Sequence, residues 1–261
     1  MLVLKDFWRM DFLVPLLKKD KAFFLAYDHG FEHGGEDFDA KNSDPEFILD
    51  LAVRGHFTAV ILQKGLAEKY YYNTPYSAQI PLIVKLNGKT NIVKTVEPYS
   101  AQNCSVKYAK MLGAKGVGYT IYLGSEFEAE MLETFGQIQE EAHNLNMAAI
   151  AWIYPRGKNV LLPESPEMLK YAARLGSELG ADMIKLKHSG DKKSFAEAVK
   201  LAGKTKVVLS GGRKETREDF CKAVEEIMAA GGTGVAVGRN VWQDDKPLDM
   251  AEKLSQIIWS S

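Results

Sequence analysis

The sequence predicts an α/β protein: a single-domain (β/α)8 TIM barrel over residues 1–261, with an extra N-terminal helix. Three observations predict this fold. Short apolar runs alternate with helix-like segments along the whole chain, eight such runs can be counted, and the 261 residues are close to the roughly 250 of a typical barrel of this type. An open doubly wound sheet is the alternative that the same alternation allows.

The eight apolar runs lack the polar alternation of a half-exposed strand, which is typical of parallel strands buried on both faces. They are Phe23–Tyr27, Thr58–Leu62, Leu82–Lys85, Gly116–Thr120, Ala148–Ile153, Met183–Lys187, Val207–Leu209 and Gly234–Val237. In a barrel of this kind the active site lies at the C-terminal ends of the strands. We therefore expect the functional residues just at or after the end of each run.

Helix-start signals stand between the runs. Ser43–Glu46 and Ser165–Glu167 each offer a cap residue followed by a proline near the first helical position. Ser125 with Glu128 has the spacing of a capping box, and Thr216 is placed to cap another helix.

Two more helices are expected at the ends of the chain. One precedes the first strand, around Leu2–Lys18, and the last spans Asp245–Trp259.

Composition excludes several classes of protein. Lys plus Arg total 33 and Asp plus Glu total 34, so the net charge of −1 lacks the basic excess of a nucleic-acid binder. No apolar run reaches the roughly 18 residues that span a bilayer, and charged residues between positions 5 and 11 interrupt any signal peptide. Cys104 and Cys221 cannot build a disulfide framework. We expect a cytoplasmic protein without nucleic-acid or membrane partners.

The sixth apolar run carries two lysines. Side chains alternate along a strand, so Lys185 and Lys187 share one face, whereas Ile184 and Leu186 share the other. If the apolar pair faces the helices, both lysines point into the barrel. Burial lowers the pKa of a lysine, which can then form a Schiff base with a carbonyl substrate. Alternatively, the lysines pair with carboxylates or bind phosphate as point charges, and spacing does not say which of them reacts.

The fifth and first runs end in further polar or aromatic side chains. Trp152 and Tyr154 share a face, and Arg156 follows in the loop. A tyrosine beside a reactive amine can act as a general acid or base, although both aromatic residues could simply fill the barrel. Asp28 directly follows the first run, where a carboxylate could orient a substrate hydroxyl or hold the charge of the lysine.

His29 and His33 follow Asp28 and stand four residues apart, so a metal site has to be considered. Such a pair chelates a metal well on a helix, but the glycines at Gly30 and Gly34 argue against a helix here. We expect these histidines to contact substrate or solvent and predict no metal site.

The seventh and eighth runs end in glycine-rich loops, which hold Ser210, Gly211 and Gly212 after one run and Gly238 and Arg239 after the other. The loops after strands seven and eight form the recurrent phosphate site of this fold. Glycines let backbone N–H groups approach phosphate oxygens, and an arginine adds charge-assisted contacts. The alternative is that these glycines only make tight turns.

Several of these motifs together resemble the archaeal-type class I fructose-1,6-bisphosphate aldolases. The resemblance covers nearly the whole chain. It is carried by Leu25–Gly34, Gly118–Tyr122, Trp152–Gly157, Ile184–Asp191, Leu209–Gly212 and Val235–Gln243.

The resemblance implies a metal-independent Schiff-base aldolase that needs no cofactor and is homo-oligomeric, often decameric. By motif, Lys185 is similar to the Schiff-base lysine of the family and Tyr154 to its general acid/base. Asp28 corresponds to its carboxylate at the first strand, and Trp152 to the aromatic residue beside the tyrosine.

The resemblance also implies a site for a phosphosugar. Ser210, Gly211, Gly212, Gly238 and Arg239 match the site for the C1 phosphate of the ketose, and Arg156, His33 and Lys187 are expected to bind the rest of the substrate, including the far phosphate.

Two features depart from the family pattern. Ser77–Ile80 looks like a small insertion, and His188-Ser189 stands where a tyrosine–threonine pair is commoner. Three other functions stay open at this point. They are a related Schiff-base aldolase or transaldolase-like synthase for another phosphosugar, a non-catalytic phosphosugar-binding barrel, and a metal-dependent enzyme that uses His29 and His33.

Overall fold

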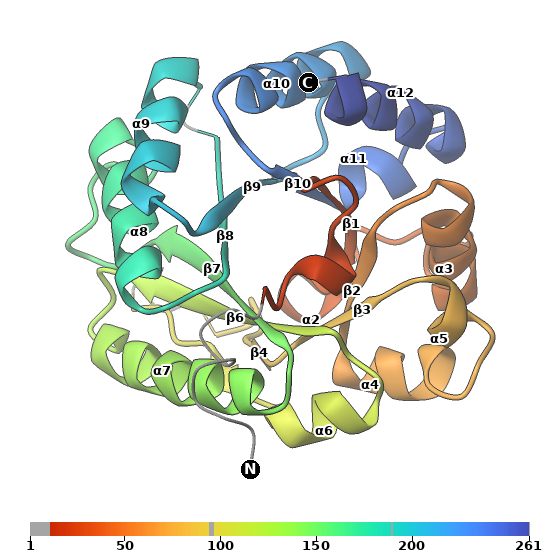
Figure 1. Ribbon diagram of the computed structural model, residues 1–261, viewed down its shortest axis with the longest axis horizontal. Coiled ribbons are helices and arrows are strands. Elements are labelled where there is room, and N and C mark those ends of the chain that lie inside the picture. The colour runs from red at the N-terminus through yellow and green to blue at the C-terminus, as the bar shows by residue number, and fades with distance from the viewer. Residues whose placement is uncertain (1–10, 94–96, 189, 261) are drawn as a thin grey trace.

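The computed structural model describes residues 11–93, 97–188 and 190–260. Eight parallel strands close a barrel in the order β1-β10-β9-β8-β7-β6-β3-β2, and helices surround it (Figure 1). The strands are β1 (Ala22–Tyr27), β2 (Ala59–Gln63), β3 (Leu82–Lys85), β6 (Gly116–Leu123), β7 (Ala148–Pro155), β8 (Met183–Leu186), β9 (Lys206–Ser210) and β10 (Gly234–Val237). The predicted barrel is confirmed. The open-sheet alternative is wrong, because β1 pairs with both β2 and β10.

The helices fall into a long outer set and a group of short turns near the barrel mouth and in the loops. The long set is α3 (Pro45–Arg54), α6 (Val106–Met111), α7 (Glu128–Asn144), α8 (Pro166–Glu178), α9 (Lys192–Ala202), α10 (Arg217–Ala229) and α12 (Pro247–Ser260). The short set is α2 (Gly30–His33), α4 (Lys64–Leu66), the π-helix η2 (Ala67–Tyr71), α5 (Tyr76–Gln79) and α11 (Arg239–Trp242). A two-stranded sheet pairs β4 (Asn87–Gly88) with β5 (Ala101–Gln102). None of the described helices is long and apolar enough to cross a membrane.

The predicted caps are confirmed at three helices. Asp44, Ser165 and Thr216 each accept a hydrogen bond from a backbone N–H in the first turn of the helix that follows. The capping box at α7 is wrong, because the helix begins only at Glu128 and Ser125 does not cap it. The Ser125 hydroxyl instead donates to a backbone carbonyl oxygen from a distant loop, at 2.7 Å.

The expected N-terminal helix is also wrong over its described part. Residues 11–18 form only a 3₁₀ turn, η1 (Val14–Leu16), and Lys18 then pairs with Lys21 in a short bridge. Pro15 stands inside the segment, where it lacks the N–H that a longer helix would require. The remainder of that prediction, residues 1–10, lies outside the described residues. The expected C-terminal helix is confirmed as α12.

The described N-terminal segment covers the base of the barrel. Phe12, Leu13 and Leu16 are buried, and they pack in one cluster with inward side chains such as Ala22 and Ala148 at the strand beginnings. Gly116 begins β6, and a Cβ there would lie 2.9 Å from Leu16. The lower end of the barrel is therefore filled with apolar side chains.

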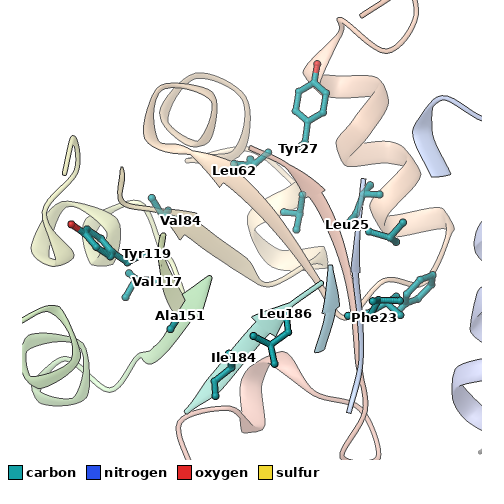
Figure 2. Close-up of a cluster of buried hydrophobic side chains, with 14 of the residues drawn as sticks. Phe23, Leu25, Tyr27, Leu62, Val84, Val117, Tyr119, Ala151, Ile184 and Leu186 are labelled. Atoms are coloured by element: carbon teal, nitrogen blue, oxygen red, sulfur yellow. The ribbon is translucent and has the colours of Figure 1, made fainter. Parts of the chain in front are cut away.

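Alternation along the strands separates two apolar clusters. Ile184 and Leu186 belong to the cluster between strands and helices, together with residues such as Leu25 (Figure 2). Met183 belongs to the second cluster, inside the barrel. Lys185 follows Met183 on the inner face, as predicted, and it is only 6% exposed.

Candidate active site

A cavity of about 310 Å³ opens at the C-terminal ends of the strands. Every site residue chosen from the sequence lines it. These are Asp28, His33, Trp152, Tyr154, Arg156, Lys185, Lys187, Ser210, Gly211, Gly212, Gly238 and Arg239. Residues from β1, β7, β8, β9 and β10 thus meet in one place, although they are distant in sequence.

Lys185 is the buried amine of this cavity. Its Nζ lies 5.3 Å from the ring centre of Trp152. Burial lowers the pKa of Lys185 to about 8, and the ammonium group of Lys85 lowers it too, whereas Asp28 and Glu32 act in the opposite direction. An amine with this pKa is partly neutral near pH 7, as a nucleophile must be.

Lys85 is a second buried lysine, and sequence reasoning left it unassigned. It is 3% exposed, its Nζ lies 3.7 Å from Asp28 and 3.6 Å from Glu32, and it too lies over Trp152. Burial alone would raise the pKa of Asp28, but the ammonium groups of Lys85 and Lys185 outweigh it, so this pKa is lowered. Asp28 is therefore an anion that pairs with Lys85 and is also stabilised by the charge of Lys185.

Tyr154 stands on the inner face of β7, and its hydroxyl lies 3.4 Å from Ser210 Oγ. Burial raises the pKa of Tyr154, with smaller contributions from Asp28 and Glu32, while the contact with Ser210 opposes the rise. The phenol is therefore protonated at neutral pH and can donate a proton to a neighbouring group.

The Nζ atoms of Lys85 and Lys185 both lie over the indole ring of Trp152. This ring fits because Gly118 faces it from β6, where a Cβ would come within 1.5 Å of the indole. Trp152 Nε1 and Thr120 Oγ1 are buried and have no hydrogen-bond partner among the described residues. Thr120 lines the cavity as well, so both atoms are available to a bound hydroxyl.

The two glycine-rich loops approach each other closely at one end of the cavity. Gly212 has a φ of +64°, and a Cβ at Gly238 would lie 2.7 Å from the carbonyl oxygen of Ala26. Asn240, which is 1% exposed, joins the loops by donating to the carbonyl oxygen of Gly211 at 2.6 Å. The backbone is therefore fixed in the open, side-chain-free form that a phosphate requires.

Arg239 completes this end of the cavity. It donates to the carbonyl oxygen of Gly212 at 2.8 Å and to Asp37 at 3.2 Å. The same oxygen of Asp37 lies 3.1 Å from His33 and 3.6 Å from His29. Asp37 was not foreseen from the sequence, because its loop reaches these partners only in the folded chain.

The histidine pair lies against the ion pair of Asp37 and Arg239. The carboxylate of Asp37 forms an ion pair with the guanidinium of Arg239. Burial lowers the pKa of His29 to about 4. Among the described residues, no group of three or more His, Cys, Asp or Glu side chains is arranged to hold a metal ion. His33 lies 3.4 Å from Arg239, which places it beside the glycine loops.

Arg156 and Lys187 occupy other parts of the cavity wall. The guanidinium of Arg156 lies 5.4 Å from the ring centre of Tyr122 and 5.9 Å from that of Tyr154. Lys187 follows the end of β8, and its ammonium group pairs with Glu164 at 2.9 Å. Both cations line the cavity outside the glycine loops.

Ser77–Ile80 and His188, which belong to the two departures from the family pattern, are not part of the lining of this cavity. Ser77–Ile80 falls on α5 and the residue after it. His188 is mostly buried, and its Nε2 lies 3.6 Å from Glu226. Ser189 lies outside the described residues.

Known proteins are similar to this chain in sequence and in fold. Residues 22–244 match the family described as DeoC/LacD family aldolase. A Thermoproteus tenax protein named class 1 fructose-bisphosphate aldolase is 47% identical over 95% of this chain and 93% of its own. A Methanocaldococcus jannaschii protein named fructose-bisphosphate aldolase/6-deoxy-5-ketofructose 1-phosphate synthase is 36% identical over 98% of this chain and 86% of its own.

A solved archaeal fructose-1,6-bisphosphate aldolase has its catalytic lysine covalently bound to the carbinolamine intermediate of its substrate. It matches with a TM-score of 0.90 at 46% identity, over 95% of this chain and 98% of that one. The chain belongs to the DeoC/LacD aldolase family.

Proposed function

We propose that this protein is a class I aldolase that reversibly cleaves fructose 1,6-bisphosphate into dihydroxyacetone phosphate and glyceraldehyde 3-phosphate. One observation carries the proposal. The buried amine of Lys185, with its lowered pKa, shares a cavity with a protonated tyrosine and with an anion-binding corner of glycine loops. The named activities of the 47% and 36% identical relatives support the same substrate.

The first step forms the Schiff base. The neutral amine of Lys185 attacks the C2 carbonyl of the ketose, and loss of water from the carbinolamine gives an iminium ion. Asp28 and Lys85 lie beside the amine, so protons can be exchanged within the cavity.

The second step breaks the C3–C4 bond. The C4 hydroxyl gives its proton to the carboxylate of Asp28, the electrons of the C3–C4 bond move into the iminium, and the aldehyde half leaves; Asp28 later returns the proton to Tyr154. The enamine that remains is protonated at C3, and Tyr154 holds the phenolic proton for this transfer. Water then hydrolyses the imine and releases dihydroxyacetone phosphate and the free amine of Lys185.

The two phosphates are assigned to different parts of the cavity. The loops at Ser210–Gly212 and at Gly238 and Arg239 hold the C1 phosphate, with Arg239 oriented by Asp37. Arg156 and Lys187 are the cations for the far half of the substrate, and His33 adds a contact beside Arg239. The enzyme acts without a cofactor, in the cytoplasm, as a homo-oligomer.

Borohydride trapping tests this function. The full-length protein is incubated with dihydroxyacetone phosphate, reduced with borohydride and digested, and the modified peptide is mapped by mass spectrometry. We expect a triose-phosphate adduct on Lys185 and none in Lys185→Met. An adduct on another lysine, or no adduct in protein shown to be folded, would contradict the proposal.

A second function is supported by the relative that is also named a 6-deoxy-5-ketofructose 1-phosphate synthase. The same lysine chemistry could pass the triose-phosphate fragment to another aldehyde. Comparing kcat/KM for cleavage of fructose 1,6-bisphosphate with that for formation of 6-deoxy-5-ketofructose 1-phosphate decides between the two. A larger value for the synthase reaction would make it the principal activity.

A further inference from the structure

A second cavity lies on the other side of α2, between the ends of β1 and β2. Its volume is about 760 Å³, compared with about 310 Å³ for the catalytic cavity. The short helix α2, which projects over the centre of the barrel in Figure 1, is the wall between them. Glu32 and His33 line the catalytic side, whereas Gly30, Phe31 and Gly34 line the second cavity.

Aromatic rings form much of the lining. Tyr27, Phe31, Phe38 and Tyr70 all contribute to it. Tyr27 and Phe38 are fixed against each other, edge to face, with ring centres 5.5 Å apart. Such rings offer flat apolar surfaces that suit a planar aromatic molecule.

The charge of the lining is positive. Lys64 and Lys69 are exposed at its edge; Lys64 donates to a backbone carbonyl oxygen, and Lys69 has no carboxylate partner among the described residues. Of the described lining residues only Asp28 is acidic, and its carboxylate is paired with Lys85 on the catalytic side. Two lysines without carboxylates favour an anion.

Two details of the backbone and side chains support a ligand site rather than an incidental hollow. Lys69 and Tyr70 lie on the π-helix η2, a rare conformation that is frequent at functional sites. Asn103 places a buried side-chain oxygen in the lining, and this oxygen has no hydrogen-bond partner among the described residues. A buried unsatisfied acceptor needs a donor, which a bound molecule can supply.

We propose that this cavity, which we call the β1–β2 cavity, binds a planar aromatic anion of the size of a nucleoside monophosphate. The ring lies against Phe31, Phe38 and Tyr70, and the phosphate or carboxylate group is held by Lys64 and Lys69. Because α2 belongs to both cavities, any effect of this ligand on substrate affinity is matched by an equal effect of the substrate on ligand affinity. The inference adds a second site to the protein and does not depend on the chemistry of Lys185.

Calorimetric titration of the full-length protein tests the site with three probes: AMP, adenosine and inorganic phosphate. Each is titrated with and without saturating dihydroxyacetone phosphate, which occupies the catalytic cavity. We expect AMP to bind with a Kd below about 1 mM under both conditions, and adenosine and phosphate to bind at least about tenfold more weakly. Adenosine equal to AMP would overturn the role of the lysines, and phosphate equal to AMP would overturn the role of the rings.

The double variant Lys64→Gln/Lys69→Gln should weaken AMP binding about tenfold or more. Its matched control, Lys107→Gln/Lys115→Gln, removes the same charge from exposed lysines outside the lining and should leave binding unchanged. Equal losses in both variants, or no AMP binding at all, would overturn the proposal. AMP that dihydroxyacetone phosphate displaces and that still binds Lys64→Gln/Lys69→Gln occupies the catalytic cavity, which would also overturn it.

Discussion

Lys85 and Lys185 are two lysines in one cavity with different surroundings. Both are buried, on β3 and β8, and their Nζ atoms lie 5.6 Å and 5.3 Å from the same indole ring. Lys85 has two carboxylates within 4.0 Å, whereas Lys185 forms no such ion pair among the described residues. Burial alone therefore does not select a nucleophile. Lys85 is paired with Asp28 and Glu32, whereas Lys185 forms no close ion pair in the described part of the chain and burial lowers its pKa.

The largest expected effect comes from replacing Lys185, the lysine that we propose forms the imine. Lys185→Met should lower the turnover of fructose 1,6-bisphosphate by more than about 10⁴-fold, because no other amine can form the imine. Steady-state cleavage assays measure this. Lys187→Met is the matched control on the next inward position and should retain turnover within about 10²-fold. Equal losses of turnover in the two variants would contradict the assignment of the imine to Lys185.

A smaller effect separates imine formation from proton transfer. Tyr154→Phe should lower turnover by about 10² to 10⁴-fold, because the phenolic proton is lost while the ring is kept. Borohydride trapping on Lys185 should continue in this variant. If turnover is unchanged, Tyr154 has no part in proton transfer. If turnover and trapping are both lost, the role of Tyr154 is structural.

The pH dependence of imine formation sharpens the comparison further. The amine of Lys185 must be neutral to attack, and its pKa is lowered to about 8, so the trapping rate should rise as pH increases through 8 and then level off. Lys85→Met removes a cation that lowers this pKa and frees Asp28 and Glu32 to raise it. The midpoint should therefore move to higher pH. A midpoint that stays in place or falls would show that Lys85 does not tune Lys185.

The smallest expected effect concerns stability, through His29 beside the glycine-rich loops. Burial lowers the pKa of His29 from its ordinary value of 6.5 to about 4. The unfolded chain therefore takes up a proton that the folded ring refuses, and stability falls as pH decreases from 6.5 to 4. Urea unfolding at pH 7 and pH 4.5 measures the loss. His29→Phe keeps a ring but cannot be protonated, so it should lose less stability over this range; an equal loss would contradict the assignment.

The sequence contains the information for the barrel because its strands are apolar on both faces. The same alternation correctly placed Lys185 inside the barrel, because it lies two residues after the inward-facing Met183. Helix starts were less certain. Ser125 bonds to a distant loop, and Pro15 lies inside the N-terminal segment, which forms only a short 3₁₀ turn in place of the expected helix.

The electrostatics of the site could not be derived in the same way. Lys85 follows Ile83 on the inner face of β3, so its burial was within reach of the alternation argument. Its partners, by contrast, come from β1 and α2, and Asp37 meets Arg239 only across 202 positions of the chain. Ion pairs between distant segments depend on loop geometry that periodicity does not record. The catalytic roles of the gathered residues remain predictions that the variants above test.

The apolar base formed by Phe12, Leu13 and Leu16 also has a kinetic meaning. Because these side chains fill the lower end of the barrel, both halves of a cleaved sugar depart from the cavity at the C-terminal ends of the strands. With the imine proposed on Lys185, the aldehyde half leaves first and the bound half leaves after hydrolysis. The packed base therefore fixes the route of departure, and the proposed imine fixes the order.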